Sequence, residues 1–206
     1  MASAQDMPAA VGRISYGETV KPGAAICSGA LVAPDLVLTA AHCVRGVAGD
    51  PAALRFDAGW TANQPSGSRR GMQVILTGAA PLAGLAGLPR DVALIVLDAP
   101  FSPREATPLR LAAPLEGAFT LHAFRRDSPE SPAPPVDCGL RSALPGLLGL
   151  DCPVVSGNSG APLLERQGTD WWIVAVMVAA SSGGPVRSWA VLPPTKVQQR
   201  IAAPPK

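Results

Sequence analysis

Glycine and proline recur throughout this chain and limit the length of any regular element. The 206 residues include 21 Gly and 23 Pro, which disrupt helices and strand ladders at short intervals. Such frequent breaks favour many short strands over long helices. With 48% hydrophobic and only 16% charged residues, the chain can bury a core without help. We therefore expect a mostly β protein, with one large domain or two small ones.

The apolar segments of residues 11–98 predict the strands of a first β domain. Two of these segments, 26–32 and 36–39, flank the turn sequence Ala33-Pro34-Asp35 and predict a hairpin. The other expected strands are an edge strand within 11–20 and the runs 54–58, 72–77 and 92–97, with a polar loop at 61–71. The continuous apolar character of these runs is typical of strands that line a barrel core.

Residues 116–206 predict a second β domain, which follows a linker at 99–115. The linker segment contains four prolines and shows little periodicity. The expected strands are 119–124, 135–140, 161–165, 172–179 and 187–192. The tract 128–135 should be an extended surface loop, because its prolines cannot donate to a sheet. Residues 195–202 predict a short C-terminal helix that is capped by Thr195.

The charge and hydropathy of the chain argue against nucleic acid and membranes as binding partners. The formal net charge is +2 and the chain has no block of Lys or Arg, so neither nucleic acid nor an anionic membrane surface is expected as a partner. No segment approaches the roughly 20 apolar residues that a membrane-spanning helix needs. We expect a soluble monomer.

Four cysteines form two pairs that are close in sequence, Cys27 with Cys43 and Cys138 with Cys152. This pattern predicts disulfides in an oxidising compartment, so the protein should be secreted or periplasmic. The small residues Ala2-Ser3-Ala4 are also similar to the end of a signal peptide. A metal site is the competing interpretation, but no CxxC or HxxxH spacing is present and only two histidines are available. We expect no metal and no other cofactor.

The segment Ser156 to Pro162 has the pattern of a nucleophile turn. Glycines on both sides of Ser159 allow a tight turn that presents its hydroxyl and leaves backbone N–H groups free to point at an oxyanion. A serine nucleophile also needs a base and a group that orients the base. His42, in the segment 39–43, and Asp91, at the start of an apolar run, provide these two groups.

These segments resemble the chymotrypsin-like (trypsin-like) serine proteases, of the bacterial type with a Gly-Asn-Ser-Gly nucleophile motif. The resemblance rests on Cys27 to Val32, Leu36 to Cys43, Asp91 to Ile95 and Gly157 to Pro162. The order His, Asp, Ser along the chain is the order of that family. The resemblance implies two packed antiparallel six-stranded β-barrels with the active site in the cleft between them.

The resemblance also implies a serine endopeptidase that hydrolyses a peptide or protein substrate through an acyl-enzyme intermediate. His42 would be the base for Ser159, and Asp91 would orient and stabilise the imidazole. The backbone N–H groups of Gly157 and Ser159 would form the oxyanion hole. A catalytically inactive protease-fold protein that binds a partner is the alternative, and an esterase is a lesser one. Retention of all three catalytic residue types favours the peptidase.

For the substrate pocket, the resemblance places Pro153 at the base, because it lies six residues before the nucleophile. Val154 would lie nearby, and Val178, Ala179 and Ala180 would form the pocket wall. This lining predicts a preference for a small or medium apolar residue before the scissile bond, unless a shifted loop brings Asp151 into the pocket. His122 is assigned to packing or to the surface, and no histidine follows it, which disfavours specificity for glutamate.

The residue before the nucleophile bears on activation. In the digestive and clotting members of the family, a freed N-terminus pairs with an aspartate at this position. Here the residue is Asn158, whose neutral amide cannot form that ion pair. The segment before Val11 also lacks the basic residue that a trypsin-type activator would need. We expect the oxyanion hole to form without a freed N-terminus. The alternative is that another protease trims this segment and that Asn158 accepts the new ammonium group as a neutral partner.

Overall fold

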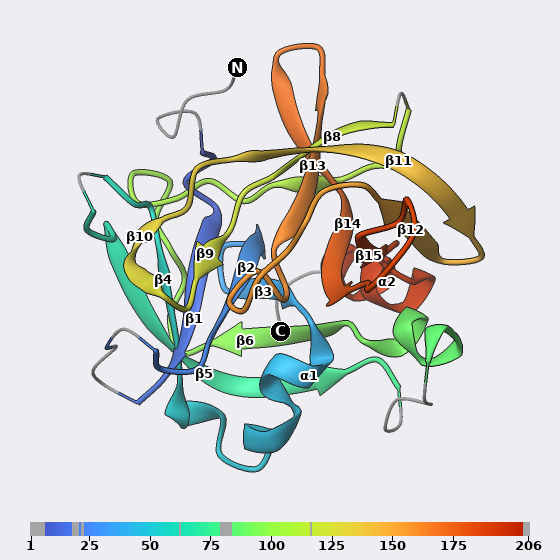
Figure 1. The fold of residues 1–206 in the computed structure, drawn as a ribbon. Coiled ribbons are helices and arrows are strands. Elements are labelled where there is room, and N and C mark those ends of the chain that lie inside the picture. Colours follow the sequence, from blue (N-terminus) through green and yellow to red (C-terminus); the bar gives the residue numbers. More distant parts are fainter. Residues whose placement is uncertain are drawn as a thin grey trace.

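The structure is a computed structural model (Figure 1). It consists mainly of two groups of β-strands, here called the first and second bodies. The residues that it describes are 7–17, 21, 23–61, 63–78, 84–115 and 117–203. None of the helices in these ranges has the length and apolar character that crossing a membrane requires.

The first body is a closed barrel of six antiparallel strands in the order β1-β2-β3-β6-β5-β4. Its strands are β1 (Val11–Tyr16), β2 (Ile26–Ala33), β3 (Leu36–Thr39), β4 (Leu54–Ala58), β5 (Gly67–Leu76) and β6 (Ala93–Leu97). The β2–β3 hairpin and β4 lie where the apolar runs predict them. Short helical turns connect the strands, namely α1 (Ala41–Val44), η2 (Arg45–Val47), η3 (Pro51–Ala53) and η4 (Leu85–Arg90).

Two predictions for the first body are wrong. The strand predicted at an edge is β1, which pairs with β2 on one side and with β4 on the other, because barrel closure leaves it no free edge. The predicted polar loop at 61–71 contains the start of β5. Its polar residues fit a strand because exposed and half-buried positions alternate from Gly67 to Arg70.

The second body closes in the same way. Its strands follow the order β13-β8-β11-β12-β15-β14, and pairing between β13 and β14 completes a six-stranded ring. The strands are β8 (Ala118–Leu121), β11 (Val136–Leu144), β12 (Leu147–Leu150), β13 (Pro162–Gln167), β14 (Asp170–Ala180) and β15 (Ser188–Val191). A short α2 (Thr195–Ala202) follows. The predicted all-β fold with two six-stranded barrels and a C-terminal helix is therefore confirmed.

Several details of the second half differ from the predictions. β10 (Ser128–Pro132) pairs with β9 (Phe124–Arg125) in a separate two-stranded sheet, where a loop is predicted. Prolines are tolerated there because the pair lies outside the barrel ladder. Thr195 does not cap α2, since the N-cap position is Pro194 without a side-chain bond. β7 (Arg110–Leu111) lies in the predicted linker and pairs in parallel with β14, whereas the division into domains stays a prediction.

Disulfides and a shared core hold the two bodies in shape. Cys27 is bonded to Cys43 and Cys138 to Cys152, with Cα–Cα distances of 6.3 and 4.8 Å, as predicted. The larger apolar cluster fills the first barrel and continues into residues of the second, such as Leu164. Because this cluster spans both barrels, they pack against each other through buried apolar surface.

Glu105 accepts a group of hydrogen bonds in the segment after the first barrel. Its carboxylate accepts from the backbone N–H (2.8 Å) and hydroxyl (2.9 Å) of Ser102. Nη2 of Arg69 lies 3.0 and 3.1 Å from the two carboxylate oxygens. These bonds, led by that from the Ser102 backbone, lower the pKa of Glu105 to about 2.

Glu105→Gln should therefore change how stability depends on pH. Because the carboxylate pKa is lower in the folded chain, its ionised form stabilises the fold above the ordinary value of 4.5, and this contribution is lost as the pH falls toward about 2. We expect the variant to be less stable than the wild type at neutral pH, with a difference that shrinks across this acidic range. Chemical denaturation at a series of pH values measures it, and a constant difference would contradict the prediction.

Candidate active site

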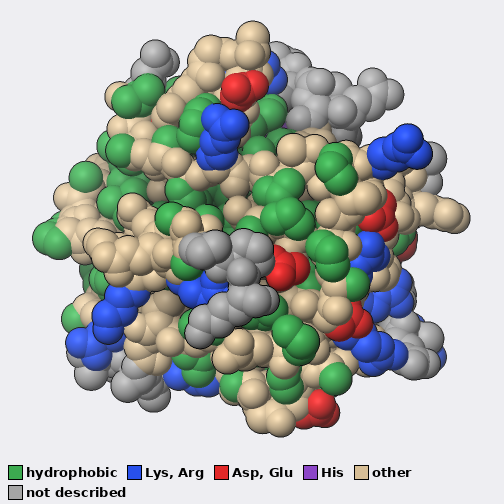
Figure 2. Space-filling view, turned by 180° about the vertical axis from the view of Figure 1, so that it is seen from behind, with side chains coloured by type: hydrophobic (Ala, Val, Ile, Leu, Met, Phe, Trp, Pro, Cys, Tyr) green, Lys and Arg blue, Asp and Glu red, His purple; other side chains and the backbone are tan. Residues whose placement is uncertain are grey.

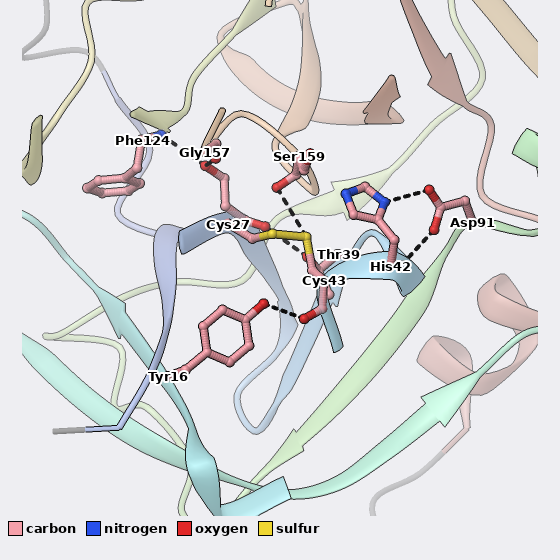
Figure 3. Close-up of a disulfide and its surroundings, with 10 residues drawn as sticks. Tyr16, Cys27, Thr39, His42, Cys43, Asp91, Phe124, Gly157 and Ser159 are labelled. Carbon is pink, nitrogen blue, oxygen red and sulfur yellow. Dashed lines mark hydrogen bonds and ion pairs between the residues drawn. A yellow bond between two sulfur atoms is a disulfide. The ribbon is translucent and has the colours of Figure 1, made fainter. Parts of the chain in front are cut away.

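The three residues predicted as a catalytic triad meet beside the Cys27–Cys43 disulfide (Figure 3). His42 lies in α1, Asp91 lies just before β6, and Ser159 lies in the loop between β12 and β13. The ring of His42 is seen between Ser159 and Asp91 (Figure 3). The first barrel thus presents the imidazole and the carboxylate, and the second presents the hydroxyl.

Strand pairing explains why His42 and Asp91 are neighbours although they are far apart in sequence. β3 and β6 are antiparallel, and Thr39, the last residue of β3, is opposite Ala93, the first residue of β6. His42 follows the end of β3 closely, and Asp91 directly precedes β6. The register of this strand pair therefore places the two side chains together.

Asp91 uses both carboxylate oxygens to hold His42. One oxygen lies 2.6 Å from Nδ1 of the ring, and the other accepts the backbone N–H of His42 at 2.7 Å. The carboxyl side chain is only 9% exposed, whereas the imidazole is 42% exposed. Because a carboxylate accepts hydrogen bonds, Nδ1 is the donor to Asp91, and among the described residues Nε2 has no hydrogen-bond partner.

A tyrosine supports the short helix that carries His42. The hydroxyl of Tyr16, from β1, donates to the carbonyl of Cys43. Burial raises the pKa of Tyr16, so its hydroxyl remains a donor around neutral pH. Together with the disulfide from Cys43 to Cys27, this bond fixes α1 against the first barrel.

The loop 156–160, here called the nucleophile turn, requires glycine at two positions. Gly157 and Gly160 have φ values of +103° and +80°, which favour glycine. A Cβ atom on Gly160 would lie 2.1 Å from Oγ1 of Thr39 and 2.3 Å from the carbonyl oxygen of Ser28. A Cβ on Gly157 would lie 2.8 Å from the backbone nitrogen of Arg126. The turn is thus packed closely against β2, the end of β3 and the segment 124–126, which contains β9 (Phe124–Arg125).

The backbone of the nucleophile turn leaves two donors unused. Within the described part of the chain, the N–H groups of Gly157 and Ser159 make no hydrogen bond. Between and beyond them, Asn158 N–H donates to Val155 O at 3.0 Å, and Gly160 N–H donates to a carbonyl of β14 at 2.7 Å. A pair of free N–H groups next to a nucleophilic serine is the arrangement that an oxyanion hole requires.

The Ser159 hydroxyl is half-buried, and among the described residues it has no hydrogen bond to the His42 ring. In sites without substrate, catalytic hydrogen bonds are often long and tighten when substrate binds. The missing serine–histidine hydrogen bond is therefore compatible with a contact that forms when substrate binds.

Asn158 holds the nucleophile turn without any charged partner. Its side-chain oxygen accepts the N–H of Val155 at 2.9 Å, and its amide nitrogen donates to Phe124 O at 3.0 Å. Val11, which cleavage by a trypsin-type activator would make the new N-terminus, is fully buried in β1, and its N–H donates to Pro8 O at 2.9 Å. Both ends of the Asn158 amide are thus occupied, and Val11 is part of the barrel wall.

The residues predicted to line the substrate pocket lie on two neighbouring segments. Pro153 is exposed and Val154 half-buried after β12, whereas Val178-Ala179-Ala180 run from buried to exposed at the end of β14. Ser188, which sequence reasoning did not single out, joins the segments. Its hydroxyl donates to Cys152 O at 2.8 Å, and it is paired with the last residue of β14. In the sequence Ser188 is an ordinary polar residue beside an apolar run, and no local signal identifies it.

Asp151, the alternative pocket residue, makes its contacts with β11. One oxygen of Asp151 accepts Gly139 N–H at 2.7 Å, and the other lies 2.6 Å from a guanidinium nitrogen of Arg141. These contacts, the backbone bond first, lower the pKa of Asp151 and hold its charge against β11. His122 is 1% exposed and packs edge-on against Trp171 with ring centroids 5.7 Å apart, in agreement with its predicted packing role.

A cavity of about 320 Å³ lies beside the nucleophile turn. Its lining consists of Gly23, Arg126, Asp127, Val155 and Ser156. Val155 is 50% exposed, so an apolar side chain is available at the surface directly beside the reactive turn.

One group of residues has the composition of a metal site but not its chemistry. The possible ligand atoms of Cys27, His42 and Cys43 lie within 4.8 Å of one another. Both sulfurs are joined in a disulfide, however, and a metal needs the thiolate form as its ligand.

Comparisons with known proteins agree with this geometry. Two antiparallel barrels with this connectivity define the chymotrypsin fold, and a family model for the trypsin-like peptidase domain matches residues 27–176. The chain therefore belongs to the trypsin-like peptidase family. A crystal structure of the scabies mite inactivated protease paralogue S-D1 is similar over 93% of this chain and 89% of that chain, with a TM-score of 0.71 and 14% identity. No curated protein matches the sequence.

The crowding at Gly160 predicts a large effect on stability. In Gly160→Ala, the methyl group would enter the space of Thr39 and Ser28 and would also require an unfavourable φ. We expect a loss of about 3 kcal/mol or more in the free energy of unfolding, measured by chemical denaturation. Gly168→Ala is the matched control, because Gly168 has a φ of +67° but no atom within 4 Å of its Cβ position. It should lose only about 1 kcal/mol, and equal losses would contradict the role of crowding.

Proposed function

We propose that this protein is a serine endopeptidase that hydrolyses peptide bonds in peptide or protein substrates through an acyl-enzyme intermediate. It would be of the bacterial type, with the motif Gly157 to Gly160. The observation that carries the proposal is the pairing of the Asp91 carboxylate with Nδ1 of His42 at 2.6 Å, beside a turn that presents Ser159 and two unused N–H groups.

Each proposed step follows from the groups in the site. Nε2 of His42 accepts the proton of Ser159 as its oxygen attacks the peptide carbonyl carbon. The imidazolium is stabilised by Asp91 and returns the proton to the leaving amine when the C–N bond breaks. A water molecule, deprotonated by the same imidazole, then hydrolyses the ester and regenerates the serine.

Negative charge that develops on the substrate oxygen would be bound by the N–H groups of Gly157 and Ser159. Loss of one such donor costs about 2.7 to 4 kcal/mol of transition-state stabilisation in related chemistry. Since these two N–H groups make no bond within the described chain, they need not break one to bind the oxyanion. The site would require no metal or other cofactor.

The proposed pocket for the residue before the scissile bond is lined by Pro153, Val154 and Val178-Ala179-Ala180. None of these side chains is charged, and Asp151 is engaged with β11. A charged substrate side chain would therefore have no partner in the pocket, and a small or medium apolar one should be preferred.

The proposed setting is secreted or periplasmic, because two disulfides persist best in an oxidising compartment. We propose a monomer that takes polypeptide substrates rather than nucleic acid or membranes. The net charge of +2 supports this, as does the right side of the face shown in Figure 2, where basic and acidic side chains lie next to one another.

The second candidate is a protease-fold protein that binds a partner but does not cut. The name of the similar scabies mite structure states that this paralogue is inactivated, so the fold can exist without catalysis. This chain has the serine, histidine and aspartate together in one site, which favours the peptidase. An esterase activity would use the same acyl transfer and is a lesser candidate.

We expect the purified, oxidised protein to cleave internally quenched peptides after a small or medium apolar residue. A peptide library that varies the residue before the scissile bond, read by fluorescence and by mass spectrometry of the products, measures the preference. Strong preference for Lys or Arg would contradict the proposed lining of the pocket.

Ser159→Ala is the matched control for this experiment. It should abolish hydrolysis while the melting temperature stays close to that of the wild type, because only one half-exposed hydroxyl is removed. Equal hydrolysis by both proteins would assign the activity to a contaminant. Absence of hydrolysis by the wild type with every peptide would favour the binding protein.

A further inference from the structure

Every carbonyl group of the nucleophile turn between residues 156 and 159 is held by a hydrogen bond. The donors are Arg126 N–H to Ser156 O (2.9 Å), Ser28 Oγ to Gly157 O (2.8 Å), Ala161 N–H to Asn158 O (3.0 Å) and Ser28 N–H to Ser159 O (2.8 Å). Four successive peptide units are thus fixed in orientation. Two of the four bonds come from a single residue, Ser28 of β2, which belongs to the other barrel.

The planar geometry of the peptide unit connects these anchors to the oxyanion hole. In a trans peptide, the C=O and the following N–H point in opposite directions, so a fixed carbonyl also fixes the next N–H. The bonds at Ser156 O and Asn158 O therefore set the directions of the Gly157 and Ser159 N–H groups. The bonds from Ser28 hold the carbonyl groups of Gly157 and Ser159, and so fix the peptide units that follow these two residues. They restrict backbone rotation at Gly157, where no Cβ atom limits it.

The hydroxyl of Ser28 is fully committed to this task. Ser28 is 0% exposed, and its Oγ donates to Gly157 O while accepting the N–H of Phe124 at 2.9 Å. Phe124 in turn accepts the side-chain amide of Asn158 at its carbonyl oxygen. Figure 3 shows Phe124 and Gly157 close to each other beside the Cys27–Cys43 disulfide.

The backbone of Ser28 makes two further hydrogen bonds near the nucleophile turn. Its N–H donates to the carbonyl oxygen of Ser159, and its own carbonyl oxygen accepts a hydrogen bond from the Thr39 hydroxyl at 2.8 Å. Ser28 therefore stands between the last residue of β3, which leads to His42, and the turn that carries the nucleophile.

We propose that Ser28 is a positioning residue that orders the oxyanion hole from the opposite barrel, through the hydrogen bond of its hydroxyl to Gly157. The inference rests on the proposed peptidase function. Ser28 does not touch the substrate. It acts by keeping the Gly157 and Ser159 N–H groups directed at the reacting carbonyl, so its effect appears in the transition state rather than in substrate binding.

Ser28→Ala tests this role. The variant keeps the backbone bond to Ser159 but leaves Gly157 O and Phe124 N–H, both buried, without the hydroxyl. Removal of a whole oxyanion donor lowers kcat about 100- to 1,000-fold, and a donor that is only loosened should have a smaller effect. We expect kcat to fall about 10- to 100-fold with KM within about twofold. Affinity for a peptidyl boronic acid, a transition-state analogue, should fall with kcat/KM.

Ser15→Ala provides the matched control. Ser15 lies in neighbouring β1 and is 1% exposed, but among the described residues its hydroxyl has no hydrogen-bond partner. The control variant should keep the kcat of the wild type. A kcat in Ser28→Ala within about twofold of the wild type, or the same loss in both variants, would overturn the inference.

Amide hydrogen exchange of the wild type tests the hydrogen bond of the Ser28 hydroxyl directly. It does not depend on whether a variant folds. The Phe124 N–H should be strongly protected if the Ser28 hydroxyl accepts it, and rapid exchange would overturn the inference. The two claims fail in different ways. A wild type that hydrolyses no peptide would overturn the proposed function, whereas an active wild type with an unaffected Ser28→Ala variant would overturn only the role of Ser28.

Discussion

The hydrogen bonds from Ser28 to the nucleophile turn are the contact on which the candidate site depends. The first barrel holds His42 and Asp91, and the second holds Ser159, so the three can work together only if the barrels keep a fixed relative position. A shared apolar core packs the barrels but has no directional preference. Two directional hydrogen bonds of 2.8 Å, from the buried Ser28 to Gly157 O and Ser159 O, fix the position of the nucleophile turn relative to the first barrel.

The turn is ordered by neutral groups alone. Asn158 satisfies Val155 N–H and Phe124 O, so its side chain adds no buried charge to the turn. The segment from Val11 onward is already a strand of the closed barrel. These contacts support the proposal that the oxyanion hole forms without a freed N-terminus.

The sequence predicts the parts of this molecule that depend on local patterns. β4 and the β2–β3 hairpin follow from apolar runs and turn residues, and the disulfides follow from close cysteine pairs. Closure of a barrel is a long-range event, and for that reason β1 is not recognisable as an interior strand. Ser28 and Ser188 read as ordinary polar residues of apolar strands, because the groups that they bind are distant in the sequence and only the fold brings them near.

We propose that the uncleaved, folded chain already contains a working acyl-transfer site. Reaction of the oxidised, uncleaved protein with a fluorophosphonate probe tests it most directly, since only an activated serine beside a formed oxyanion hole reacts quickly. The account predicts one probe per molecule, located at Ser159 by mass spectrometry. Absence of labelling, or labelling that begins only after the chain is cut before Val11, would contradict it.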